Sequence, residues 1–309
     1  NMALILVGDF DIEATKPLIE KTFGKLEARP LPARTEYPTT AFEQDERYSA
    51  KLGYMPELYI AYNGVPVGDK DELLLDFLGE ILSNSMQIGL LDELTLDNKL
   101  MYAGAVNDVR RDQGRFLVVA VPYMDAETQT YTSLKETEEL VNEAIQQLVS
   151  GNITEELVEA VRQNFYQEFD RTMEYPEMKV QLLQNAFTYQ QSIEEMLQLK
   201  EQVAAITMDD LKNAAKKYLG APKKVFEIEE GTPKKDKLPK PKIKSLESPK
   251  GESAYRQYFD SIPAGKLSPT FIDFSDIDQD LFYEGVSVYC TPNTKNHIFS
   301  LRLKYGIGT

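Results

Sequence analysis

The chain of 309 residues contains one cysteine, one histidine and no tryptophan. The single cysteine, Cys290, excludes a disulfide within the chain. The single histidine, His297, excludes a zinc site that needs two histidines, and a serine or cysteine protease site would have to be built on that one imidazole. Most of the residues that usually carry catalysis are therefore missing.

Long apolar runs and an excess of basic residues are also absent. No run approaches the roughly 20 residues of a membrane-spanning helix, and residues 1–9 hold no basic stretch typical of an export signal. Acids outnumber bases 50 to 34, so the net charge of −16 disfavours nucleic acid and other anionic partners. The isolated glycines lack the spacing of a phosphate-binding loop, and no nucleotide site is predicted. We therefore expect no membrane span and no nucleic-acid partner.

With 42% hydrophobic residues, the chain can bury a sizeable core. Its centre alternates between strand-like and helix-like segments, and two apolar strands flank Asp112-Gln-Gly114 as an antiparallel pair would. This pattern predicts an α+β fold, a mostly antiparallel sheet with helices packed on one face. The predicted strands are 58–62, 102–109, 116–121 and 225–228, and the predicted helices are 71–83, 90–97, 133–149, 154–174, 178–189, 192–205 and 211–219. The buried stripe should include Leu74, Phe77, Leu78, Ile81, Val141, Ile145, Leu148, Val161 and Phe165.

The two ends of the chain look like parts of other domains. A strand at Met2–Val7 is followed by a helix that Asp11 can cap and that ends near Gly24. Pro233–Lys250 holds seven lysines and two acids, a charge of +7 − 2 = +5, and resembles a semi-extended linker, either solvated or lying along an acidic neighbour. Beyond it, Gly285–Cys290 and Ile298–Tyr305 predict a hairpin, which is too small to be stable alone.

Five segments in the same order resemble the zinc metallopeptidase family that includes insulin-degrading enzyme, pitrilysin and the mitochondrial processing peptidase (M16-type). Each segment is weak by itself, whereas the ordered set covers nearly the whole chain except the linker. The segments are Asn1–Asp11 with Lys21–Gly24, Pro66–Leu94, Gly151–Leu157, Ile206–Leu219, and Gly285–Asn293 with Phe299–Gly306.

The resemblance implies a clamshell of two halves, each built from two similar α+β domains, enclosing a chamber in which peptides are cut. It also implies zinc on a His-x-x-Glu-His helix of the first domain, a motif that a chain with one histidine cannot contain. This chain is then a non-catalytic segment of a large zinc-dependent endopeptidase, with no cofactor of its own and zinc in an absent upstream domain. Its partners would be peptide or unfolded protein substrates and the other half of its parent protein.

In this register the chain divides into four parts. Residues 1–28 give the closing strand and helix of a preceding domain, and 50–229 the non-catalytic peptidase-like α+β domain. Residues 230–280 form the Lys/Pro-rich linker, and 281–309 the first hairpin of a following domain. Pairing of the unpaired terminal strands, within one chain or in a homodimer, would cover their exposed edges.

Tyr102 is the one candidate substrate-binding residue. The family often carries an arginine and, about a turn later, a tyrosine that contact the peptide, and Tyr102 matches the tyrosine. Thr95 stands where the arginine is expected and Lys99 where a glycine is usual, so the charged half of the pair is missing. Either Tyr102 donates a hydrogen bond to a peptide carbonyl, or it is an ordinary half-buried strand tyrosine.

Other polar residues are better explained without a functional site. Acids at Glu136–Glu139 and Glu155–Glu156 fall in the first turns of predicted helices, where they favour the helix dipole. Glu227–Glu230 lies at a strand end, Cys290 is expected to be a small buried hydrophobe and His297 a surface residue of a turn.

Two alternatives remain open. The parent protein could be a scaffold derived from the same fold without peptidase activity, or the chain could be an unrelated acidic α+β binding module. The family resemblance favours the periplasm, with the cytoplasm as the alternative that the absence of cysteine pairs permits.

Overall fold

The computed structural model describes residues 2–27, 29–30, 33–35, 40–233, 239, 241–242, 251–263, 265, 268–269, 271, 273–283, 285–294 and 298–306. The chain divides into two compact units, Asn1–Pro233 and Lys234–Thr309. His297 and most of the predicted linker Pro233–Lys250 lie outside the described residues.

The first unit is built around a five-stranded sheet in the order β1-β7-β2-β4-β3. Its strands are β1 (Glu46–Gly53), β2 (Glu57–Asn63), β3 (Leu100–Val109), β4 (Gly114–Pro122) and β7 (Lys223–Glu230). β2 runs antiparallel to both β4 and β7, and β3 runs antiparallel to β4, whereas β1 is parallel to β7. The predicted mostly antiparallel sheet is confirmed. β5 (Met124–Asp125) and β6 (Thr130–Tyr131) form a short separate ribbon.

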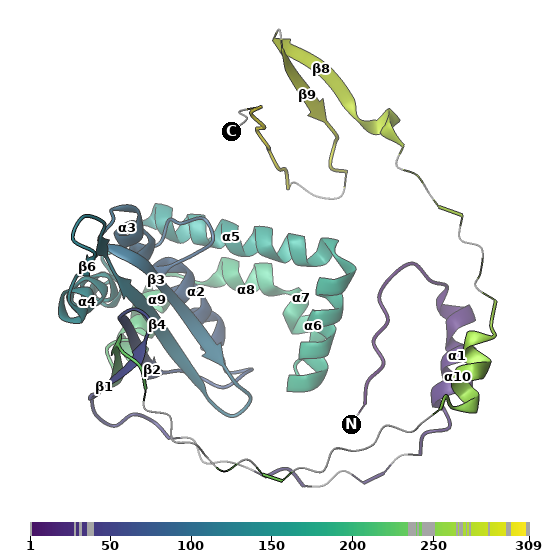
Figure 1. Ribbon diagram of the computed structural model, residues 1–309, viewed down its shortest axis with the longest axis horizontal. Helices are drawn as coiled ribbons and strands as arrows, with labels where there is room; N and C mark the ends of the chain where they lie inside the picture. The colour runs from purple at the N-terminus through teal and green to yellow at the C-terminus, as the bar shows by residue number, and fades with distance from the viewer. Residues whose placement is uncertain are drawn as a thin grey trace. The chain divides into compact units, whose positions relative to one another are not determined.

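Helices cover one face of this sheet (Figure 1). The helices of the first unit are α1 (Ile12–Phe23), α2 (Glu72–Leu82), α3 (Leu90–Leu96), α4 (Leu134–Ser150), α5 (Glu155–Glu174), α6 (Pro176–Tyr189), α7 (Ile193–Leu197), α8 (Leu199–Ala205) and α9 (Met208–Tyr218). α2 and α3 pack on β3, and α4 packs on β2 and β4. α5 is the longest helix, and Figure 1 shows α6 turning away from its end, after Tyr175.

The core lies between the sheet and these helices. Along β4, Phe116, Val118 and Ala120 are buried, while the residues between them are partly exposed, as expected when a strand faces helices on one side only. Of the nine residues of the predicted stripe, all but Leu74 and Phe165 are buried, and these two pack against the core.

Local signals in the sequence set the helix boundaries. Asp11 caps α1, and Thr207 caps α9, each by accepting the backbone N–H of the third helical residue. Ser133 and Glu136 form a capping box at the start of α4, and Gly151 ends that helix with φ of 75°, a conformation that favours glycine.

Two predictions within the first unit are wrong in detail. The expected single helix 192–205 is two helices that break at Gln198, where Gln202 donates a side-chain hydrogen bond to the carbonyl of Glu195. The break lets α8 pack on α5, with Lys200 bonded to Asp170. Met2–Val7 forms no strand, because no other strand of the described residues pairs with it.

The second unit also differs from the predicted hairpin. β9 (Val286–Cys290) matches the first predicted strand, but it pairs with β8 (Asp278–Tyr283), and the described residues 298–306 form no strand. α10 (Ala254–Asp260) and a short 3₁₀ turn at Phe274–Asp276 lie within the range predicted as linker. The pairing of the chain's two ends, and the homodimer built on it, stay predictions.

We expect Phe77→Ala to lower the free energy of unfolding by about 3–5 kcal/mol, because it empties a fully buried ring site. The Phe77 ring stacks on Phe165 at 5.4 Å, so the neighbouring helix α5 loses a contact as well. Urea unfolding followed by circular dichroism would measure the loss. Tyr54→Ala is the control, since Tyr54 is 100% exposed, and a comparable loss in both variants would contradict the core assignment.

Candidate functional site

The side of the sheet away from the helices carries apolar side chains from all five strands. Because side chains alternate along a strand, the residues between the core positions gather on this side, which we call the open face. The strand register aligns Tyr48, Phe226, Tyr59 and Val119 in one row across four strands. Tyr48 and Phe226 stack with ring centroids 5.1 Å apart. The open face comprises Tyr48, Tyr59, Tyr102, Val106, Leu117, Val119, Val121, Phe226 and Ile228.

Several of these side chains are well exposed although they are apolar. Tyr102 is 55% exposed, Val106 52% and Tyr48 46%. Scattered apolar residues are ordinary on protein surfaces, whereas a continuous apolar patch marks a surface that contacts another molecule. The open face is therefore a candidate binding surface.

One end of the open face is covered by the segment that leads into β1. The side-chain amide of Asn63 accepts the backbone N–H of Phe42 at 2.9 Å and donates to the carbonyl of Phe42 at 3.3 Å. The guanidinium of Arg115 lies 4.6 Å, and the ammonium of Lys224 4.8 Å, from the centre of the Phe42 ring. We call this arrangement the Phe42 clasp. The Phe42 clasp thus holds the cationic groups of both Arg115 and Lys224 at that end of the sheet.

Tyr102 lies on β3, the edge strand next to β4. A bulge at Met101 shifts the register just before it, and the Tyr102 hydroxyl lies over Gly104, where an added Cβ would come within 2.7 Å of it. On the outer edge of β3, the hydroxyl of Ser83 accepts the backbone N–H of Ala105 at 2.8 Å. Tyr102 is thus a strand residue whose ring is about half exposed beside a sheet edge.

Thr95 and Lys99, which occupy the other positions of the family pattern around Tyr102, make contacts within their own segments. Thr95 lies in α3 and donates its hydroxyl to the carbonyl of Leu91 at 3.5 Å. Lys99 forms an ion pair of 3.1 Å with Asp97. Neither residue extends the open face.

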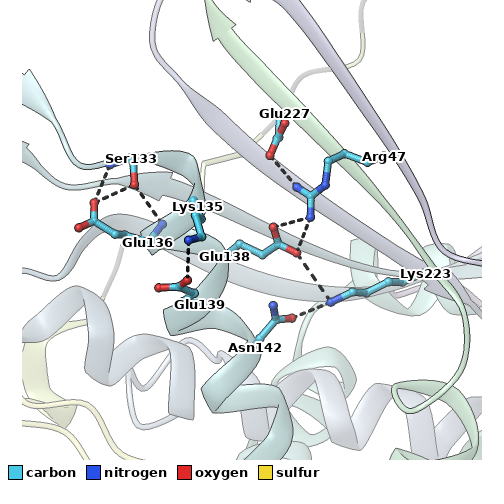
Figure 2. A network of polar contacts seen from close by, with 9 residues as sticks. All are labelled: Arg47, Ser133, Lys135, Glu136, Glu138, Glu139, Asn142, Lys223 and Glu227. Carbon is cyan, nitrogen blue, oxygen red and sulfur yellow. Dashed lines mark hydrogen bonds and ion pairs between the residues drawn. The ribbon is translucent and has the colours of Figure 1, made fainter.

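A polar network ties the opposite edge strand, β1, to α4 (Figure 2). Arg47 donates to Glu138 at 2.8 Å and to Glu227 at 2.6 Å, and Lys223 donates to Asn142 at 2.7 Å. The hydrogen bond with Glu138 raises the pKa of Arg47. By themselves, the positions of Glu138 near a predicted helix start and of Glu227 at a predicted strand end give no signal in the sequence for this network. The alternation with buried Val225 could have placed Glu227 on the helix side.

A column of three acids, Glu72, Asp76 and Glu80, follows one side of α2 at helical spacing. The Asp76 carboxylate accepts the side-chain amide of Asn107 at 2.9 Å, and Glu80 accepts that of Asn164 at 2.9 Å. Burial raises the pKa of all three carboxyls, and that of Asp76 to about 6. Glu72 and Asp76 also line a pocket of about 860 Å³ on the helix side.

The other candidate residues add no site. Glu136 belongs to the capping box of α4, and Glu155 and Glu156 are exposed in the first turn of α5. Cys290 was expected to be buried but is exposed on the short two-stranded sheet of the second unit. Within the described residues, no group of three or more His, Cys, Asp or Glu could hold a metal ion.

Comparison with family models shows which protein family the chain belongs to. The family model described as the inactive domain of peptidase M16 matches residues 1–165, more than half of the chain. The chain belongs to the M16 peptidase family. It carries the family's non-catalytic domain, as its sequence indicated. A search of curated proteins finds no match.

Solved structures share the M16 fold at low sequence identity. A protease from Helicobacter pylori aligns with a TM-score of 0.62 and 18% identity over 72% of this chain and 54% of its own. The M16 inactive domain from Pseudomonas fluorescens aligns with a TM-score of 0.60 and 15% identity over 74% and 53%. The periplasmic protease PqqL from Escherichia coli aligns with a TM-score of 0.53 and 12% identity over 72% and 25%. The chain thus spans about half the length of the first two.

Among the helices in the described part of the chain, none is long and apolar enough to cross a membrane.

We expect Asp76→Asn to stabilise the protein at neutral pH. The pKa of Asp76 is about 6 in the folded chain and near 3.8 without its surroundings, so between these values the folded state holds more protons than the unfolded state. The free energy of unfolding therefore falls as pH rises through this window and stays lower above it. The variant, which cannot ionise, should gain up to about 3 kcal/mol at pH 7 and little at pH 4. Urea unfolding at both pH values would test this, and equal gains at the two would contradict it.

We expect Arg47→Met to cost about 1–2 kcal/mol of stability, because Glu227 loses its ion pair and Glu138 keeps only Lys223, whose ammonium is 4.0 Å away. The side chains of Glu138 and Glu227 are only 12% and 23% exposed. Arg171→Met is the matched control, since Arg171 and its partner Glu168 are both about half exposed and their pair should contribute less than about 0.5 kcal/mol. Similar losses in thermal or urea unfolding would show that the network adds nothing beyond an ordinary surface pair.

Proposed function

We propose that this chain forms a substrate-facing wall of a zinc-dependent M16 endopeptidase, with the zinc and the bond cleavage in a domain outside the chain. The observation that carries the proposal is the open face, an exposed apolar surface that spans all five strands of a domain of the non-catalytic type. A helix-covered sheet needs no such surface for its own stability. A peptide bound there would shield it from water.

The edge strand β3 supplies the second part of a peptide site. An extended peptide can add a strand to an exposed sheet edge, where backbone hydrogen bonds give affinity and side-chain contacts give preference. Tyr102 and Val106 lie on β3 and point to the open face, so a peptide along this edge would contact both. In this proposal Tyr102 provides a ring for packing and a phenol that can donate to a peptide carbonyl.

The remaining parts of the proposal concern the parent protein. We infer that residues 1–28 close a preceding domain, that 50–229 form the non-catalytic domain, and that 230–280 connect it to a following domain that begins at 281–309. The partners would be peptides or unfolded proteins and the other half of the same parent. The likeness to a periplasmic protease favours the periplasm.

We expect the chain to bind an extended, predominantly apolar peptide without cleaving it. Tyr102→Ala should weaken binding about tenfold because it truncates an aromatic contact, and Val106→Lys should weaken it similarly by placing a charge on the apolar face. Fluorescence anisotropy with a labelled peptide would measure both. Phe187→Ala is the control, since Phe187 is 48% exposed on the helix α6.

Equal weakening by the Phe187 control would show that binding is not specific to the open face. Cleavage of a quenched peptide by this chain with zinc, abolished by a chelator, would contradict its non-catalytic role. A parent protein without His-x-x-Glu-His upstream would favour the alternative, a scaffold of the same fold.

A further inference from the structure

We propose that Glu57 is a subsite for a positively charged side chain, so that the open face prefers peptides in which an arginine or lysine stands among apolar residues. This inference rests on the proposed function, because it names the class of peptide that the same surface would select.

Glu57 lies at the start of β2, the central strand of the sheet, and faces the open side. Leu58 and Ile60 point into the core, so Glu57 and Tyr59 point the other way. The Tyr59 hydroxyl donates to the Glu57 carboxylate at 2.5 Å, which confirms that both side chains share that face. This hydrogen bond raises the pKa of Tyr59.

The surroundings of Glu57 on the open face are mostly apolar. Ile228 of β7 is directly opposite it, and on the other side the register of β2 with β4 continues to Val121, which pairs in turn with Tyr102. Two strand spacings, about 10 Å, therefore separate Glu57 from Tyr102. A peptide that continues from the β3 edge across the open face would reach both residues.

The charges of the open face are uneven along the strands. At the end with the Phe42 clasp, Lys224 forms an ion pair of 3.1 Å with Glu46, and Arg115 donates to the carbonyl of Thr40 at 2.7 Å. At the opposite end, neither Glu57 nor Glu230 forms an ion pair with a Lys or Arg of the described residues. Glu57 and Glu230 thus have no ion-pair partner among the described residues, because the nearby Lys51 and Lys99 pair with Glu229 and Asp97.

This arrangement selects against purely apolar ligands that cover Glu57. Such a ligand would remove water from the carboxylate and supply only the existing bond from Tyr59, which is unfavourable for a charged group. An arginine or lysine of the peptide would replace the lost water by charge-assisted hydrogen bonds. Since the carboxylate is partly buried, the pair should be stronger than an exposed ion pair and should weaken with added salt.

The test compares two fluorescein-labelled peptides that differ only in one central residue, arginine or its uncharged analogue citrulline. Anisotropy titrations use the full chain, Glu57→Gln and Glu156→Gln. Glu156 is exposed in the first turn of α5, so its variant removes the same charge from the helix side. The wild type should bind the arginine peptide about tenfold more tightly. Glu57→Gln should abolish this preference with little change for the citrulline peptide, and Glu156→Gln should retain it.

Three results would overturn the inference. If the wild type binds both peptides equally, or if the two variants reduce the preference to the same extent, the open face still binds peptides but Glu57 is no subsite. If neither peptide binds, the proposed function fails and the subsite fails with it.

Discussion

The alternation of side chains along five paired strands is the constraint on which the rest of the first unit depends. The side chain of every second residue of β2 and β4 points into the helix-covered core, and the side chains between them lie on the other face. A shift of the register by one residue would place Phe116 and Val118 in water and Arg115 in the core. The apolar character of the open face is therefore not needed for folding, and this makes it informative about binding.

The sequence predicted most of the elements that bury apolar residues and missed those that do not. β1 was not predicted because its residues, such as Arg47, Ser49 and Lys51, are polar and largely exposed, and its place in the sheet depends on pairing with β7 nearly 180 residues away. The break at Gln198 was also invisible, since it depends on how α8 packs against α5. The role proposed for Tyr102 rests partly on a family pattern, whereas the role proposed for Glu57 has no sequence signal, because a single Glu before an apolar strand is common.

The two edge strands of the sheet, β1 and β3, differ in their side chains and in the regularity of their register. β1 presents charged side chains and an irregular register near its end, features that discourage pairing with another strand. β3 presents Met101, Tyr102 and Val106, and on its outer edge the Ser83 hydroxyl accepts the backbone N–H of Ala105. Pairing of an extended ligand with the sheet would therefore be much more favourable at β3 than at β1.

Substitutions at Gly104 are limited by the neighbouring Tyr102 side chain. The hydroxyl end of Tyr102 occupies the space that a Cβ at position 104 would need, so even alanine there would move this half-exposed ring. The two positions are therefore coupled through this contact. Truncating the side chain at position 102 would uncover the backbone at 104, and a side chain added at 104 would move the Tyr102 ring.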